Sequence, residues 1–238
     1  MKTVALIERV IGEEGLELLG WRDVPVDPAA LGRDSRAVQP KIRQVFVGRG
    51  SQIQDAEQLE RKLYTVRKVI EHSLDDCGLC EHEADYFYIC SLSCNTIVYK
   101  GLLMTHQISG FYPDLNDESL VSAFALVHSR FSTNTLGSWR LAHPYRCLAH
   151  NGEINTLRGN INWMTARQAV LESNLFGEDI KKLYPILIPG ASDTATIDNA
   201  YEFLLMGGRS LPHVMAMLIP EAWEKDNHIS PERRAFYE

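Results

Sequence analysis

The sequence predicts an α+β protein in which helices and strands form layers. Residues 54–73 carry apolar side chains at helical spacing, whereas 42–47 alternates and 86–92 is rich in aromatic and β-branched residues. Strands come early and are then mixed with helices, without the regular strand–helix alternation of a doubly wound parallel sheet. The pattern therefore favours layers of both element types.

The first part of the chain supplies two helices and two strands. Residues 2–14 read as an amphipathic helix that ends at glycines, and 16–24 has strand character. Three prolines and a glycine make 25–40 a loop. The strand at 42–47 and the helix at 54–73 follow.

The second part mixes short β runs with helices. An acidic loop is predicted at 75–85, and the β runs 86–92 and 96–99 are joined by a turn that could make them a hairpin. No repeat or interdomain linker interrupts the chain. The remaining predicted elements are a short helix near 103–110, buried strands at 123–128 and 145–150, and helices at 158–173, 193–206 and 210–218.

Composition narrows the class of protein. Of 238 residues, 45% are apolar and 23% charged, which is ordinary for a globular protein. The formal charge of −7 argues against nucleic acid as a partner. The chain lacks the roughly 18 consecutive apolar residues of a membrane span, and charged residues interrupt the N-terminus too early for a signal peptide. We therefore expect a cytoplasmic protein, and the odd count of five cysteines favours free thiols.

The first polar cluster, 128–135, follows the predicted strand 123–128 and contains Arg130 and Thr133. Polar groups where a strand enters a loop often build a site. The alternative is structural: Arg130 pairs with a carboxylate, and the Ser and Thr residues form turns.

The second cluster centres on Asn151 and Gly152, after the run 145–150. Asn-Gly after a β run is a strong hairpin signal, so a plain turn is one interpretation. The other is functional, because the Asn151 side-chain amide and the Gly152 N–H can donate together to a developing oxyanion.

The third cluster contains Ser192 and Asp193, at the start of the predicted helix 193–206. Ser192 fits an N-cap and Asp193 the first helical turn, so a structural role suffices. The functional alternative is that Asp193 holds an ammonium group. With Arg130 for a carboxylate and Asn151–Gly152 for an oxyanion, the three clusters complement an α-amino acid whose side-chain carbonyl is under attack.

These segments resemble the class II glutamine amidotransferase domain of glutamate synthase. The resemblance covers almost the whole chain and points to glutamate synthase over other class II amidotransferases. The runs that carry it are HSRFSTNT (128–135), WRLAHPYRCLAHNGEINTLRGN (139–160), SDTATIDNA (192–200) and GRSLPHVMAMLIPEAW (208–223).

The resemblance implies a fold, a ligand and site residues. The fold would be part of the αββα sandwich of N-terminal-nucleophile hydrolases. Arg130 would bind the α-carboxylate of L-glutamine, Asp193 its α-amino group, and Thr133 would help to position it. Asn151 and Gly152 would form the oxyanion hole.

The resemblance also implies partners. Ammonia from glutamine would pass to synthase domains of the same parent chain, which add it to 2-oxoglutarate. In the family those domains carry FMN and an iron–sulfur cluster, and a small electron-transfer subunit can be present. We expect no cofactor or metal site in residues 1–238.

One departure from the family pattern matters. The family nucleophile is a cysteine at the mature N-terminus, whose α-amino group has a pKa of about 7.7–8.0 and can act as the base. This chain begins Met1-Lys2-Thr3, and its first cysteine is Cys77. We therefore expect 1–238 to be an incomplete amidotransferase domain, truncated at both ends and inactive by itself.

Two other functions stay open at this point. The chain could be a non-catalytic glutamine-binding or interaction module. It could also bind a metal through Cys77 and Cys80, with His72 and His82 nearby, although a lone Cys-x-x-C needs such added ligands to form a zinc site. Cys147, near Asn151, reads as a small buried residue and not as a substitute nucleophile.

Overall fold

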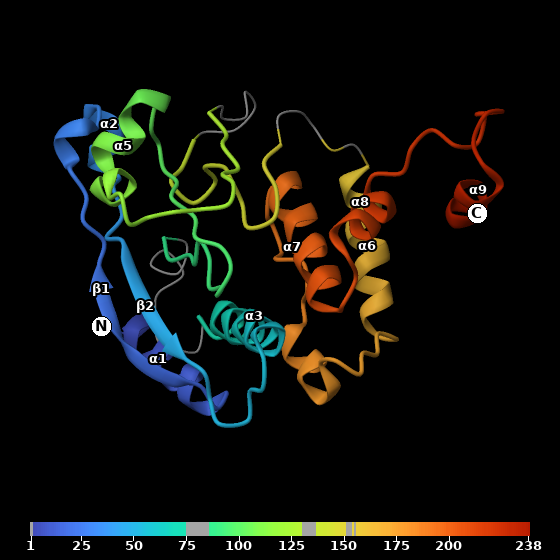
Figure 1. The fold of residues 1–238 in the computed structure, drawn as a ribbon, viewed down its shortest axis with the longest axis horizontal. Helices are drawn as coiled ribbons and strands as arrows, with labels where there is room; N and C mark the ends of the chain where they lie inside the picture. The colour runs from blue at the N-terminus through green and yellow to red at the C-terminus, as the bar shows by residue number, and fades with distance from the viewer. Residues whose placement is uncertain (1, 75–85, 130–136, 151–153, 155) are drawn as a thin grey trace.

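A computed structural model describes residues 2–74, 86–129, 137–150, 154 and 156–238 (Figure 1). Helix α3 (Ala56–His72) lies in the middle of the molecule, between the sheet layer and the C-terminal helices. Its start is fixed by the Asp55 side chain, which accepts a hydrogen bond from the Gln58 N–H at 2.8 Å.

One face of α3 packs on the N-terminal layer. Helix α1 (Lys2–Glu13) buries an apolar stripe against it, and β1 (Glu17–Asp23) pairs antiparallel with β2 (Arg43–Gly48) beside them. The pairing is irregular between Leu18 and Gly20, where Gly20 adopts φ +149°, a conformation that side chains disfavour. The core of this layer consists of Leu6, Ile7, Val10, Ile11, Leu16, Leu63, Val66 and Ile70.

The opposite face of α3 packs on the C-terminal helices. Tyr64 joins a second core there, built on the 3₁₀ helix η5 (Gly177–Leu183) and on helix α7 (Asp193–Met206). Because both faces of α3 are covered, polar side chains on it are buried too. The surrounding helices are α6 (Leu157–Gln168), α8 (Leu211–Leu218) and α9 (Pro231–Tyr237), with α9 at the edge of the molecule (Figure 1).

A third core closes the end of the sheet. It joins Val24 and Leu31 to Phe111, Tyr112 and Trp139. The short elements around it are η1 (Pro28–Ala30), α2 (Arg33–Ala37), η3 (Thr105–Gln107), α5 (Ile108–Phe111) and η4 (Pro113–Asn116).

The helices and the first two strands are confirmed, with small differences in their bounds. Helix α6 ends earlier than the predicted 158–173, and the loop predicted at 25–40 contains the short helices η1 and α2. Helix α9 was not predicted. The acidic loop at 75–85 lies outside the described residues.

The predicted strands at 86–92, 96–99, 123–128 and 145–150 are wrong for the residues described. None of these runs forms a hydrogen-bonded ladder with a neighbour there, and a strand is stable only when its backbone groups are paired. The 123–128 run is also not buried, since Phe124 is 81% and Val127 74% exposed. The apolar residues of these runs suggested strands, but they carry no information on whether a neighbouring strand is present to pair with.

The architecture is mixed helix and strand, with a two-stranded sheet among the described residues, and it agrees with the predicted α+β class. Within the same parts of the chain, no helix has both the length and the apolar character needed to cross a membrane.

The packing of α3 predicts a stability change. Replacement of the fully buried Ile70 by alanine removes apolar contacts and leaves a cavity, so we expect Ile70→Ala to lower the free energy of unfolding by about 2–5 kcal/mol. Urea denaturation measures this change. The control is Val38→Ala at a 57% exposed position, expected to change it by less than about 0.5 kcal/mol. Equal effects of the two substitutions would contradict this packing.

Candidate functional site

The candidate site lies at the N-terminus of α7. Ser192 is its N-cap, as predicted, and its Oγ accepts a hydrogen bond from the Ala195 N–H at 3.2 Å. Asp193 follows in the first turn, where the helix dipole favours a carboxylate.

Asp193 connects α7 to the segment that carries the Asn-Gly pair. Its Oδ1 accepts from the Thr194 N–H at 2.7 Å, and its Oδ2 accepts from the Ile154 N–H at 3.1 Å. Ile154 directly follows 151–153. The Asp193 side chain is partly exposed, so the carboxylate retains lone pairs that can accept further hydrogen bonds.

A row of rings links His128, the first residue of the first polar cluster, to the same place. The His128 and His143 rings lie 4.5 Å apart, and the His143 and Tyr145 rings 5.0 Å apart. The Tyr145 hydroxyl lies 3.1 Å from Ser192 Oγ. His128, His143, Tyr145 and Ile154 therefore gather around Ser192 and Asp193, although these residues come from segments far apart in sequence.

His143 is held neutral at this junction. Burial, together with the neighbouring His128, lowers the pKa of His143 to about 4. Lys100 and His150 act in the same direction, whereas Asp193 opposes them. A neutral ring also suits the geometry, because His143 Nδ1 accepts a hydrogen bond from the His150 N–H at 3.3 Å.

A cavity of about 1220 Å³ adjoins the site. Tyr145, Ala191, Ala195 and Lys100 are among the residues that line it. Burial lowers the pKa of Lys100 to about 8, while its Nζ donates to the Arg140 carbonyl at 2.7 Å and lies 4.9 Å from the centre of the Tyr145 ring. The cavity wall thus combines aromatic surface with cationic groups.

The predicted site residues are only partly described. Arg130, Thr133, Asn151 and Gly152 lie outside the described residues, whereas Asp193 lies at the junction. Two neighbours of these four residues in sequence are described: His128 lies near His143, and Ile154 donates to Asp193.

The hypothesis of a metal site on Cys77, Cys80 and His82 also falls outside the described residues. His72 is described, and its two ring nitrogens lie 3.2 and 3.1 Å from the carbonyl oxygens of Lys182 and Pro185. Among the described residues, no three His, Cys, Asp or Glu side chains are grouped to hold a metal ion.

The described cysteines are poor nucleophiles. Burial raises the pKa of Cys147 and of Cys90, and burial together with Glu60 raises that of Cys94 to about 11. Since the thiolate is the reactive form, none of the three is activated. This agrees with the interpretation of Cys147 as a structural residue.

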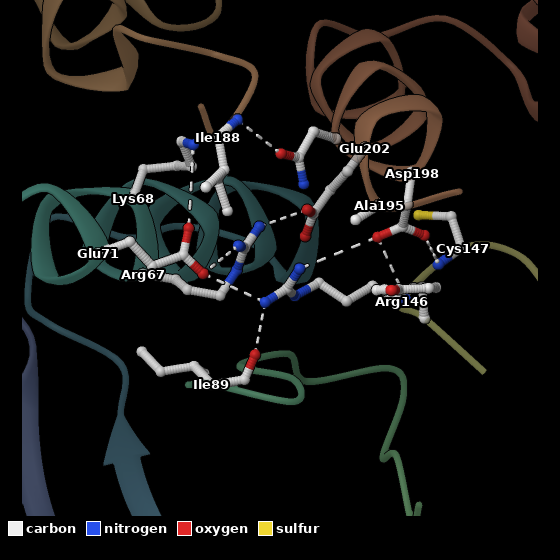
Figure 2. A network of polar contacts seen from close by, with 12 residues as sticks. Arg67, Lys68, Glu71, Ile89, Arg146, Cys147, Ile188, Ala195, Asp198 and Glu202 are labelled. Carbon is white, nitrogen blue, oxygen red and sulfur yellow. Dashed lines mark hydrogen bonds and ion pairs between the residues drawn. The ribbon is translucent and has the colours of Figure 1, made fainter. Parts of the chain in front are cut away.

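The sequence interpretation missed a buried network of charges behind the site (Figure 2). Arg67 on α3 pairs with Glu71 at 2.7 Å and with Glu202 on α7. Arg146 lies between α3 and α7, where its guanidinium contacts Glu71 at 3.1 Å and Asp198 at 3.9 Å. The sequence contained one indication of this network, because charged residues are spaced i, i+4 at Arg67–Glu71 and at Asp198–Glu202. The same spacing is common on solvent-exposed helices, so it did not predict burial.

Burial and the cations act in opposite directions on these carboxyl groups. Burial disfavours the charged form of Glu71, but Arg67 and Arg146 outweigh it and hold the pKa of Glu71 at about 2. At Asp198 burial dominates, and with Glu202 it raises the pKa above its usual value.

Comparison with known proteins identifies the family. The family of glutamine amidotransferases class-II matches residues 1–238. The chain is 53% identical over 232 residues to the glutamate synthase [NADPH] large chain of Bacillus subtilis (strain 168), covering 98% of this chain and 15% of that protein. It is 48% identical over 230 residues to glutamate synthase [NADH] of Schizosaccharomyces pombe, covering 94% and 11%.

A third relative, the chloroplastic ferredoxin-dependent glutamate synthase of Oryza sativa subsp. japonica, is 43% identical over 237 residues, covering 98% of this chain and 14% of that protein. The chain belongs to the class II glutamine amidotransferases. Within them, it is similar to the amidotransferase part of glutamate synthases, and it spans about one seventh or less of the length of these relatives.

The low pKa of His143 predicts a pH dependence. The folded state favours the neutral ring, because its pKa of about 4 lies below the ordinary 6.5. This stabilisation is fully present above pH 6.5 and is lost as the pH falls from 6.5 to 4. We expect His143→Gln to lose less stability than the wild type over this range, as measured by urea unfolding. An NMR titration of His143 with a midpoint near 6.5 would contradict this account.

Proposed function

We propose that this chain binds L-glutamine as part of a glutamate synthase, where its hydrolysis supplies ammonia for the formation of glutamate from 2-oxoglutarate. The observation that carries the proposal is the junction at the N-terminus of α7. There Asp193 accepts a hydrogen bond from Ile154, and the row of rings from His128 ends on Ser192.

Each end of glutamine has a matching group. The partly exposed Asp193 carboxylate would accept the α-ammonium group. Arg130, two residues after His128, would bind the α-carboxylate with a bidentate guanidinium contact that lysine cannot reproduce. Thr133 would assist in positioning.

The reacting carbonyl would face Asn151 and Gly152. These residues immediately precede the stretch that Asp193 holds through Ile154, so the amino-acid end and the amide end of one ligand can be bound together. Two donors aimed at the developing oxyanion stabilise the transition state, and one such donor typically contributes about 2.7–4 kcal/mol.

The proposal extends to the fold and to partners. We take the small sheet and its flanking helices as part of the αββα sandwich. FMN, the iron–sulfur cluster and contacts with an electron-transfer subunit belong to other domains of a full-length glutamate synthase. The names of the relatives differ in the electron donor they print, so their similarity does not assign one to this chain.

A second candidate is a glutamine-binding module without turnover. The raised pKa values of Cys90, Cys94 and Cys147 agree with both candidates, because the family nucleophile is an N-terminal cysteine and not one of these thiols. Both candidates require the same glutamine pocket. Hydrolysis by the chain alone that is lost in Asn151→Ala would exclude the second candidate.

Calorimetry tests the pocket. We expect L-glutamine to bind, and Arg130→Ala or Asp193→Ala each to weaken binding by roughly tenfold to a hundredfold, since each removes a charge-assisted contact of about 1.5–3 kcal/mol. The matched controls are Arg33→Ala and Asp34→Ala, which remove a cation and an anion from an exposed pair on α2. Glutamine binding that is unaffected by the two site substitutions would exclude the assignment.

A further inference from the structure

Asp198 occupies an unusual position for a carboxylate. Its side chain is fully buried on α7, just over one helical turn beyond the Asp193 carboxylate. A buried carboxylate without partners is costly, and a well-packed apolar residue is often at least as stabilising as a buried ion pair. The partners of Asp198 must therefore compensate for the cost of burying its charge.

The contacts of Asp198 are directed at the backbone. Its Oδ1 accepts from the Cys147 N–H at 2.8 Å, and its Oδ2 accepts from the Arg146 N–H at 3.3 Å. These are consecutive amides of the run 145–150, which the sequence suggested as a strand. In a sheet, the carbonyl groups of a neighbouring strand would accept hydrogen bonds from such amides. Here the Asp198 carboxylate accepts them.

The run has few other backbone contacts among the described residues. The Tyr145 N–H donates to the Leu148 carbonyl at 3.0 Å, which closes a turn but does not attach the run to another element. The run is attached to the start of α7 by side chains, Ser192 at Tyr145 and Asp198 at Arg146 and Cys147. A third side chain, Asp193, holds Ile154 further along the chain.

These three points fix the described residues on either side of 151–153. The run 145–150 leads into them and Ile154 follows them, so both flanks are fixed to the same helix. The Arg146 side chain also anchors the run 145–150 to other parts of the molecule. It donates to the Ile89 carbonyl and to Glu71 on α3 (Figure 2).

We propose that Asp198 is a positioning residue, which holds the run 145–150 on α7 beside Asp193, where the proposed glutamine site lies. This inference rests on the proposed glutamine site and deepens it. Asp198 acts through the backbone of Arg146 and Cys147 and does not touch the ligand.

The test compares two changes in the same buried network. Asp198→Asn keeps the shape, but its amide nitrogen must face one of the two backbone N–H groups, donor against donor. Glu202→Gln, one turn further along α7, perturbs the contact with Arg67, whereas the hydrogen bonds from the Arg146 and Cys147 amides go to Asp198, so this variant controls for a loss of stability in the same network. Glutamine affinity is measured by calorimetry, and the amide exchange rate of Ile154 by NMR.

We expect Asp198→Asn to weaken glutamine binding about tenfold and to speed exchange of the Ile154 amide, while Glu202→Gln leaves both near the wild-type values. Equal effects of the two variants, or wild-type behaviour of Asp198→Asn, would overturn the proposal. If the wild type fails to bind glutamine, the proposed function fails, whereas Ile154 exchange still tests the positioning role.

A measurement on the wild type covers the case in which Asp198→Asn does not fold. The Arg146 and Cys147 amides should exchange as slowly as the interior amides of α7, because Asp198 accepts both of them. Rapid exchange of both would overturn the proposal.

Discussion

The buried charges between α3 and α7 are the constraint on which the rest of the structure depends. Arg67 is fully buried, and its guanidinium joins Glu71 on its own helix to Glu202 on α7. Charges removed from water must be paired, so α3 and α7 can approach only in the arrangement that satisfies these groups. Arg146 extends the same network to the segment that leads into the candidate site.

Because α3 is covered on both faces, it fixes how the N-terminal layer and the C-terminal helices lie relative to each other. Its apolar face packs on α1 and the β1–β2 pair, and its polar face packs on α7. At the N-terminus of α7, Ser192 then contacts the Tyr145 hydroxyl, and Asp193 accepts a hydrogen bond from the Ile154 N–H. The site is thus built by tertiary contacts and not by any one local motif.

Much of the helical structure could be predicted from the sequence. Helices α1, α3 and α7 have local signals, such as apolar periodicity and the Asp55 and Ser192 caps. The runs at 86–92, 96–99, 123–128 and 145–150 have β composition, but strand formation depends on a partner that sequence does not supply. Helix α9 and the short helices at 28–37 were missed, since each spans at most a few turns.

For the candidate site, the sequence offered two interpretations of Asp193, a residue of the first helical turn or a ligand of an ammonium group. The structure shows the first, places Asp193 against Ile154 and leaves the second as a proposal. Asp198 was missed, because an acid within a helix normally indicates the solvent face, whereas burial depends on the packing of α3 and α7. Residues such as Arg130 and Asn151 were chosen for their chemistry, and their position near the site remains a proposal.

The central claim is that distant segments form one pocket for a single amino acid. A crystal structure of the chain with L-glutamine tests it most directly. The account predicts one glutamine whose ammonium contacts Asp193, whose carboxylate contacts Arg130, and whose side-chain carbonyl faces Asn151 and Gly152. A glutamine bound elsewhere, or Arg130 and Asp193 on separate faces of the molecule, would contradict it.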